Sequence, residues 1–262
     1  MSTVTGTRIH PGAWVDPAAQ LGVDVDVGPG TIVGPEVRIG DRTRIGAQAL
    51  VTGWTRIGSG CRIHHGAVLG SPPQDLKFKG ERTELVIGDD TEVREYVTAN
   101  LATQAEAPTR VGSHVLLMAY AHVAHDCQLQ DHVIVANAVQ FAGFVTVEEW
   151  AIVGGGTVVH QFVRIGRHAI IGGGSRIPQD VLPFVMTAGS PPRNAGINRI
   201  GLERRGFGAP VRQALEQAYR ILLREGLTVA EAVARIRATL PDQPEVEHFA
   251  RFAETSVRGI SR

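Results

Sequence analysis

The sequence predicts a mainly β protein: a parallel β-helix of hexapeptide repeats followed by a small C-terminal α-helical domain. An aliphatic residue recurs at every sixth position from Ile9 to Ile177, with two interruptions, and the pattern stops after Ile177. An α-helix has a period of 3.6 residues and a half-buried strand a period of two, so neither produces this pattern. A hexapeptide repeat does, and it is typical of a β-helix.

Two further positions of each hexad support this fold. The residue after the aliphatic one is often glycine, and we expect it to take the unusual backbone angles of a tight corner because it lacks a Cβ. A small or β-branched residue follows four positions after the aliphatic one, and we expect it to point inward as well. Three hexads then close a triangular coil, and stacked coils pair their strands about 4.8 Å apart. Examples of the small position are Thr31, Thr43, Cys61, Ala67, Thr91, Ala121, Cys127 and Ala169.

The repeat lapses twice, over residues 71–84 and 99–109. In the first segment Asp75 and Glu81 occupy aliphatic positions, and in the second Ala99 and Ala105 do. Both segments are predicted to be loops that leave the coil at a corner. Loops on a rigid scaffold often carry binding and catalytic residues.

The C-terminal part has a different pattern, so we divide the chain into a β-helix domain, residues 1–189, and a helical domain, residues 190–262. Apolar residues at helical spacing predict a helix over 210–225, and Gly226 is a plausible stop. Thr228 and Glu231 form a capping-box pattern for a second helix reaching about residue 240. Pro244 suits the first turn of a third helix.

Composition excludes several classes of protein. The 26 Lys and Arg balance the 26 Asp and Glu, so the net charge gives no reason to expect a nucleic-acid partner. No stretch is long enough to span a membrane, and the segment from Met1 to Thr7 lacks the apolar run of a signal peptide. Cys61 and Cys127 occupy small inward positions, where we expect free thiols in a reducing, cytoplasmic compartment.

The candidate chemistry lies in a column of residues spaced by one coil. His125, Gly143 and Gln161 follow one another at intervals of three hexads, so they should stack at equivalent corners of successive coils. An imidazole beside an approachable backbone N–H is a minimal site for acyl transfer, because one group takes a proton and the other stabilises an oxyanion. Asp126 and His122 accompany His125.

Two alternatives stand beside this interpretation of the histidines. Most corner histidines are expected to be only solvated or hydrogen-bonded, and a zinc site is the second option for His122 and His125. The trimeric hexapeptide-repeat carbonic anhydrases space their close histidine pair more widely, so we expect no metal here. The histidines assigned to the first alternative are His10, His64, His65, His114, His132, His168 and His248.

Four blocks of sequence resemble the UDP-N-acetylglucosamine O-acyltransferases of lipid A biosynthesis, nearly end to end. The hexad repeat alone would be a weak sign of function, because many acyltransferases share it, whereas these blocks in this order are specific. The resemblance implies a left-handed β-helix, against the usual crossover rule, and a homotrimer with its site between subunits. The blocks are Pro73–Lys77 with Gly80 and Glu81, Leu117 and Met118 with His122–Asp126, Val159–Phe162, and Asn198 with Gly201–Phe207.

The resemblance also implies the reaction, which moves an (R)-3-hydroxyacyl group from acyl carrier protein to the 3-hydroxyl of UDP-N-acetylglucosamine. No cofactor beyond the carrier-protein thioester is implied. His125 would be the general base, tuned by Asp126, and the Gly143 N–H would be the oxyanion donor.

The same resemblance assigns the remaining site residues. Asp75 and Lys77 would contact the glucosamine, with Gln74 in support. The sugar and acyl pocket would be lined by His122, His160 and Gln161. The uridine and phosphates would be held by Asn198, Arg204 and Arg205, which suits guanidinium chemistry.

Gly173 matches the position that ends the acyl groove in this family. A glycine leaves the groove open, which by the resemblance implies a donor chain of about fourteen carbons. The alternative is that Gly173 merely forms a corner with the glycines on either side of it.

Three departures from the family pattern leave the acceptor open. Phe144 stands where a histidine is common, Asn100 and Leu101 stand where a His-Arg pair is usual, and Ile200 replaces a glutamate. A 3-amino sugar nucleotide, which would give an amide, is an alternative acceptor, and so is another nucleotide sugar. A related protein that binds the nucleotide sugar or carrier protein without turnover is the non-enzymatic alternative.

Overall fold

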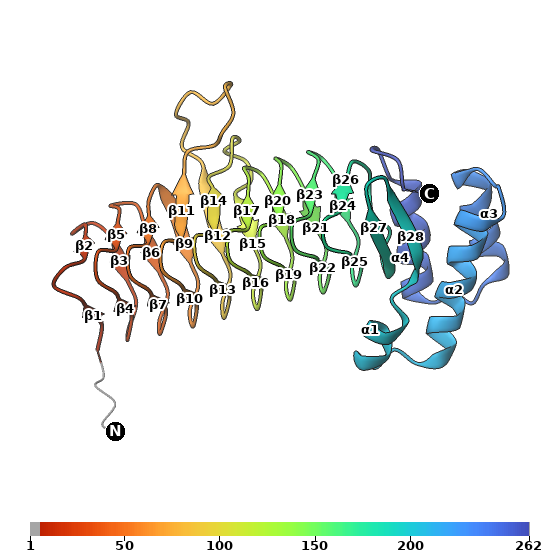
Figure 1. Ribbon diagram of the computed structural model, residues 1–262, viewed down its shortest axis with the longest axis horizontal. Coiled ribbons are helices and arrows are strands. Elements are labelled where there is room, and N and C mark those ends of the chain that lie inside the picture. The colour runs from red at the N-terminus through yellow and green to blue at the C-terminus, as the bar shows by residue number, and fades with distance from the viewer. Residues whose placement is uncertain (1–5, 262) are drawn as a thin grey trace.

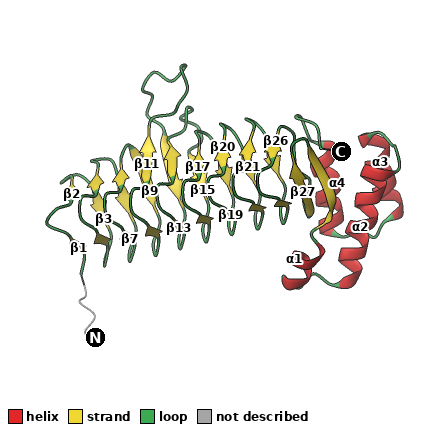
Figure 2. Ribbon diagram, in the orientation of Figure 1, coloured by secondary structure: helices red, strands yellow, loops and turns green. Residues whose placement is uncertain are grey.

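The computed structural model describes residues 6–261 and has the shape of a long prism with a helical domain at its C-terminal end (Figure 1). The segment from Met1 to Thr7, for which the sequence predicts no signal peptide, lies mostly outside these residues. The predicted class, a left-handed parallel β-helix with C-terminal helices, is confirmed. Figure 2 shows the short strands in successive rows along the prism.

Within residues 6–261, three sheets form the faces of the prism, and the chain visits them in turn. Sheet A consists of β1 (Arg8–Ile9), β4 (Asp26–Val27), β7 (Arg44–Ile45), β10 (Arg62–Ile63), β13 (Glu92–Val93), β16 (Leu116–Leu117), β19 (Ile134–Val135), β22 (Ile152–Val153), β25 (Ile170–Ile171), β27 (Val185–Gly189) and β28 (Pro192–Ile197). Sheet B consists of β2 (Trp14–Val15), β5 (Ile32–Val33), β8 (Leu50–Val51), β11 (Val68–Ser71), β14 (Thr98–Asn100), β17 (His122–Val123), β20 (Gln140–Phe141), β23 (Val158–Val159) and β26 (Arg176–Ile177). Sheet C consists of β3 (Gln20–Leu21), β6 (Arg38–Ile39), β9 (Trp54–Ile57), β12 (Glu84–Ile87), β15 (Thr109–Val111), β18 (Gln128–Leu129), β21 (Thr146–Val147) and β24 (Arg164–Ile165).

Strand pairing confirms the coil of three hexads and the two loops. Leu50 pairs in parallel with Val68, three hexads further along the chain. Val68 then pairs with Thr98, five hexads further along, and Thr98 pairs with His122 after another four hexads. The first loop therefore adds two hexads to its coil and the second loop adds one. For this reason the aliphatic positions stay in phase on both sides of each loop.

The core lies where the hexad pattern predicts it. Phe141 is 1% exposed, and the aliphatic positions from Val27 to Ile177 that carry Ile, Leu or Val are buried as well. The small position also points inward, and Thr31 donates its hydroxyl to the Gly46 carbonyl of the next coil at 2.6 Å. Cys61 and Cys127 are both buried free thiols. Each coil thus adds both large and small inward residues to one continuous core.

The expectation for the glycine after the aliphatic residue is wrong. Within residues 6–261, Gly70 alone of that set has a positive φ, and the left-handed conformation occurs instead three residues after the aliphatic one, as at Asp126 (φ 60°). At the position directly after the aliphatic residue, glycine is needed instead because the next coil packs closely against it. A Cβ on Gly28 would lie 2.8 Å from the carbonyl carbon of Gly46 in the next coil.

The C-terminal domain packs its helices over their own core at the end of the rod. The capping box is confirmed, because Thr228 Oγ1 accepts from the Glu231 N–H at 3.2 Å and Glu231 accepts from the Thr228 N–H at 2.9 Å. Gly226, the predicted helix stop, has a φ of 72°. The pattern did not predict the first of these helices, but it did predict the others. The helices of the described residues are α1 (Arg199–Arg204), α2 (Ala209–Arg224), α3 (Val229–Thr239) and α4 (Pro244–Glu254).

The predicted division after residue 189 falls in the turn of a hairpin. Strand β28 pairs antiparallel with β27, and β27 pairs in parallel with β25 of the rod. The chain end also returns to the rod, where Asp180 bridges Ile260. None of the helices in the described part of the chain has the length and apolar character needed to cross a bilayer.

Replacing the buried ring of Phe141 by alanine should lower the free energy of unfolding by about 3–5 kcal/mol, because the rigid coil leaves a cavity that its neighbours cannot fill. Denaturant titration measures this loss. Gln140→Ala, one residue earlier and exposed, is the control and should change little. Equal effects of the two substitutions would contradict the assignment of inward and outward positions.

Candidate active site

The corner between sheets B and C carries the predicted column. His125 follows β17, Gly143 follows β20 and Gln161 follows β23, one above another. The Phe144 N–H donates to the His125 carbonyl at 3.1 Å, and the Phe162 N–H donates to the Gly143 carbonyl at 3.2 Å. The predicted stacking of His125, Gly143 and Gln161 is therefore present in the backbone.

His125 and Asp126 form a hydrogen-bonded pair. The His125 Nδ1 lies 2.7 Å from Asp126 Oδ2, and the two side chains are 13% and 7% exposed. A carboxylate on Nδ1 favours the tautomer with the proton on that nitrogen, which leaves Nε2 as a proton acceptor. This is the arrangement that a general base requires.

Gly143 places its backbone beside the imidazole. A Cβ at this position would lie 2.7 Å from His125 Nε2, so a larger residue would displace the ring. Within residues 6–261, no protein group accepts a hydrogen bond from the Gly143 N–H. The residue next to the base therefore has a backbone donor without a partner in the described part of the chain.

The two predicted loops border an open cavity of about 820 Å³ over this corner. The first loop projects from the rod between β11 and β12, and the second lies between β14 and β15 (Figure 1). The structure thus brings the first-loop residues of the predicted site to His125 and Gln161. The lining residues are Gln74, Asp75, Leu76, Lys77, Phe78, Glu81, Thr103, Gln104, His125, Phe144, Gln161 and Phe162.

Aromatic residues that the sequence analysis did not assign form part of the wall. Phe144 meets the His125 ring edge-on, with centroids 5.4 Å apart, and stacks on Phe162 at 4.8 Å. Both phenylalanines have positive φ, as Asp126 does one coil below. Their spacing of one coil could have identified them. The departure at Phe144 thus makes the cavity wall apolar beside the base.

Two other predicted histidines lie beside the column. His122 faces outward from β17, with its Nδ1 2.6 Å from Thr98 Oγ1, and burial together with the nearby His125 lowers the pKa of His122. His160 is exposed, with its Nδ1 3.2 Å from Arg258 Nη2. Neither lines the cavity of the single chain.

The remaining predicted residues lie on other corners. Gly173 follows β25 at the corner between sheets A and B, beside Gly155. Asn198 is 5% exposed, and its amide caps α1 and donates to the His168 carbonyl at 3.0 Å. One chain alone does not bring these residues to His125.

Arg204 and Arg205 are near the corner between sheets C and A. Arg204 is exposed, and the Arg205 guanidinium lies 3.9 Å from the centre of the Trp150 ring. Burial lowers the pKa of Arg205. Burial and the charges of Arg205 and Arg167 lower the pKa of His168 to about 4. This corner therefore presents positive charge on an aromatic surface.

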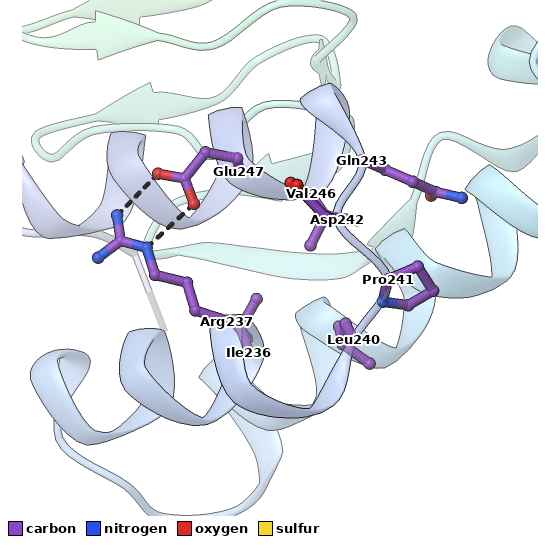
Figure 3. A pocket seen from close by; sticks show the side chains of 8 residues that line it. All are labelled: Ile236, Arg237, Leu240, Pro241, Asp242, Gln243, Val246 and Glu247. Carbon is purple, nitrogen blue, oxygen red and sulfur yellow. Dashed lines mark hydrogen bonds and ion pairs between the residues drawn. The ribbon is translucent and has the colours of Figure 1, made fainter.

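A second cavity of about 280 Å³ lies between α3 and α4 (Figure 3). Its wall includes Leu240 and the ion pair of Arg237 with Glu247, at 2.8 Å. It contains no residue of the predicted site. Among the described residues, no three His, Cys, Asp or Glu side chains gather as metal ligands.

The fold and this corner define a class, the hexapeptide-repeat proteins with a histidine–aspartate pair over a β-helix corner. Comparison with known proteins narrows the class. A family model described as "Udp N-acetylglucosamine O-acyltransferase; Domain 2" matches residues 180–261, and a hexapeptide-repeat model matches residues 36–71.

Full-length relatives agree with these models. The chain is 46% identical to the acyl-[acyl-carrier-protein]–UDP-N-acetylglucosamine O-acyltransferase of Halorhodospira halophila, covering 98% of this chain and 100% of that protein. It is 42% identical to the enzyme of the same name from Thermodesulfovibrio yellowstonii, over 97% and 99% of the two chains. The crystal structure of the UDP-N-acetylglucosamine acyltransferase from Bacteroides fragilis matches with a TM-score of 0.95 and 40% identity, over 97% and 100%. The chain therefore belongs to the UDP-N-acetylglucosamine O-acyltransferase family, as the sequence blocks predict.

Gly143→Ala should lower the rate of acyl transfer by on the order of 100-fold or more while the protein stays folded, because the added methyl displaces the base and leaves the core intact. The His125 Nε2 lies in the path of this methyl. Steady-state rates and circular dichroism measure the two effects. An unchanged rate would contradict the placement of Gly143 beside the base.

Proposed function

We propose that this protein transfers an (R)-3-hydroxyacyl group from acyl carrier protein to the 3-hydroxyl of UDP-N-acetylglucosamine, the first step of lipid A biosynthesis. The observation that carries the proposal is the stacking of Gly143 on His125, whose imidazole lines the cavity between the two loops. The relatives that share nearly the whole chain carry the name of this activity.

The geometry accounts for each bond change. His125 Nε2 takes the proton of the sugar 3-hydroxyl, and the oxygen attacks the thioester carbonyl carbon. The Gly143 N–H stabilises the oxyanion of the tetrahedral intermediate. When the intermediate collapses, the carbon–sulfur bond breaks and the carrier-protein thiolate takes the proton back from His125. The Asp126 carboxylate, hydrogen-bonded to His125 Nδ1, stabilises the imidazolium.

The acceptor is held by groups from the loop and from the helical end. We assign Asp75 and Lys77, at the cavity wall, to the glucosamine, with Gln74 in support. We assign His122, His160 and Gln161 to the sugar and acyl pocket. Gln161 lines the cavity of one chain, whereas the two histidines lie beside the column. The nucleotide is assigned to a second set, consisting of Asn198, Arg204 and Arg205.

We propose a homotrimer with the site between neighbouring subunits, and the separation of these two sets on one chain supports it. His125 is on the corner between sheets B and C, whereas Arg205 packs on Trp150 at the corner between sheets C and A. A second copy could bring the two corners together. An apolar outward row on sheet A supports such packing, because its side chains are only half-buried in one chain. This row consists of Leu116, Ile134, Ile152 and Ile170.

We place the protein in the cytoplasm. Cys61 and Cys127 are free, and burial raises the pKa of the Cys127 thiol to about 12. A buried thiol that stays protonated is a poor nucleophile. Such unpaired cysteines suit a reducing compartment.

His125→Ala should lower turnover by on the order of 10³-fold or more, because the general base is lost, while the thermal midpoint changes little. The assay uses a series of acyl-carrier-protein thioesters with UDP-N-acetylglucosamine and identifies products by mass. His65→Ala is a matched control, because His65 occupies the same hexad position on another corner.

Absence of product at every chain length with the unaltered protein would refute the proposed function. A large loss of stability in His125→Ala would instead assign His125 a structural role.

Gly173→Met should shift donor preference to shorter acyl chains, because a side chain there would occupy the end of the proposed groove. A Cβ at Gly173 would lie 3.0 Å from the Gly155 carbonyl oxygen, so the neighbouring backbone must shift slightly to accept the new side chain. Competition among donors of different length measures the preference. The same optimum in both proteins would contradict the assignment of Gly173 as the residue that sets chain length.

A further inference from the structure

The second loop reaches the His125–Asp126 pair through Thr103. The Thr103 hydroxyl donates to Asp126 Oδ2 at 2.6 Å, and the Thr103 backbone N–H donates to Oδ1 at 3.0 Å. Oδ2 is the same oxygen that lies 2.7 Å from His125 Nδ1. Both oxygens of the carboxylate are therefore engaged, and one residue of a loop supplies two of these contacts.

The backbone of Asp126 is held as well. Its N–H donates to Thr109 Oγ1 at 2.7 Å, at the other end of the same loop. The residue is 9% exposed and has a left-handed φ of 60°. The second loop thus contacts Asp126 from both of its ends, and the orientation of the carboxylate depends on the loop being in place.

We propose that Thr103 is a positioning residue for the His125–Asp126 pair, acting through Asp126 rather than on the substrate. The proposal rests on the proposed function, in which His125 is the base. The Thr103 hydroxyl fixes the direction of Oδ2, and Oδ2 in turn holds the proton on His125 Nδ1 and the free electron pair on Nε2.

The same loop is tied to the first loop, which carries Asp75 and Lys77. Asn100 Nδ2 donates to the Pro72 carbonyl at 3.0 Å, and the Leu101 N–H donates to the Ser71 carbonyl at 3.0 Å. Thr103 also lines the cavity between the two loops. The contacts form a continuous path from the first loop, through the second loop, to Asp126 and His125. The second loop therefore holds the base in place beside the loop that we assign to the acceptor.

Thr103→Val tests this role, because it removes the hydroxyl and keeps the shape and the backbone N–H. We expect kcat to fall by on the order of 10- to 100-fold, the effect of losing a hydrogen bond to a charged group. The KM for the nucleotide sugar should stay within roughly twofold, since the ground-state contacts remain. Thr103→Ser restores the hydroxyl and should recover most of the rate.

Thr83→Val is the matched control. Thr83 is 1% exposed, and among the described residues its hydroxyl has no hydrogen-bond partner. The same chemical change there should leave kcat and KM as they are. The proposal is overturned if Thr103→Val has the rate of the unaltered protein, if it changes KM alone, or if Thr103→Ser is equally impaired.

A second measurement needs no turnover and separates this proposal from the proposed function. In the ¹⁵N-histidine NMR spectrum, the His125 signals are assigned by their loss in His125→Ala. One tautomer, protonated at Nδ1, is expected in the unaltered protein and in Thr103→Ser, and a mixture or exchange broadening in Thr103→Val. Identical spectra of the unaltered protein and Thr103→Val would overturn the role of Thr103. If the spectra differ as expected but the unaltered protein shows no acyl transfer, the proposed function alone is overturned.

Discussion

The structure depends on one constraint: each coil must stack on the next in register, with large side chains inside. Hydrogen bonds between coils and the continuous apolar core both require residues one coil apart to lie above each other. This requirement converts a spacing in sequence into a distance in space. It places His125 and Gly143, which are remote along the chain, within contact of each other.

The rod and the loops have separate roles in the site. The rod supplies the parts that must not move, which are the imidazole and the backbone amide at one corner. The loops supply the parts that enclose a ligand, with Asp75 and Lys77 on the first and Thr103 on the second. Because both loops insert whole hexads, the coils above and below them keep the same phase of inward positions.

Features that follow from the regular spacing of residue types could be predicted from the sequence. The coil length, the inward positions, the column through His125 and the capping box at Thr228 all depend on spacing alone. The fold of the loops does not depend on spacing, so the contact of Thr103 with Asp126 could not be predicted from the sequence. The reason for the glycines was also missed, because close approach between coils depends on a neighbour in the next coil and not on local turn geometry. The short helix α1 has too few residues for a recognisable period.

The central claim is that His125 faces the hydroxyl that receives the acyl group, on the same side as the Gly143 amide. A crystal structure with bound UDP-N-acetylglucosamine tests it directly. We predict that the sugar 3-hydroxyl oxygen lies about 2.6–3.2 Å from His125 Nε2, with the Gly143 N–H pointing to the space where the thioester carbonyl would sit. A sugar bound in the cavity with its 3-hydroxyl turned away from His125, or bound on another face of the rod, would contradict it.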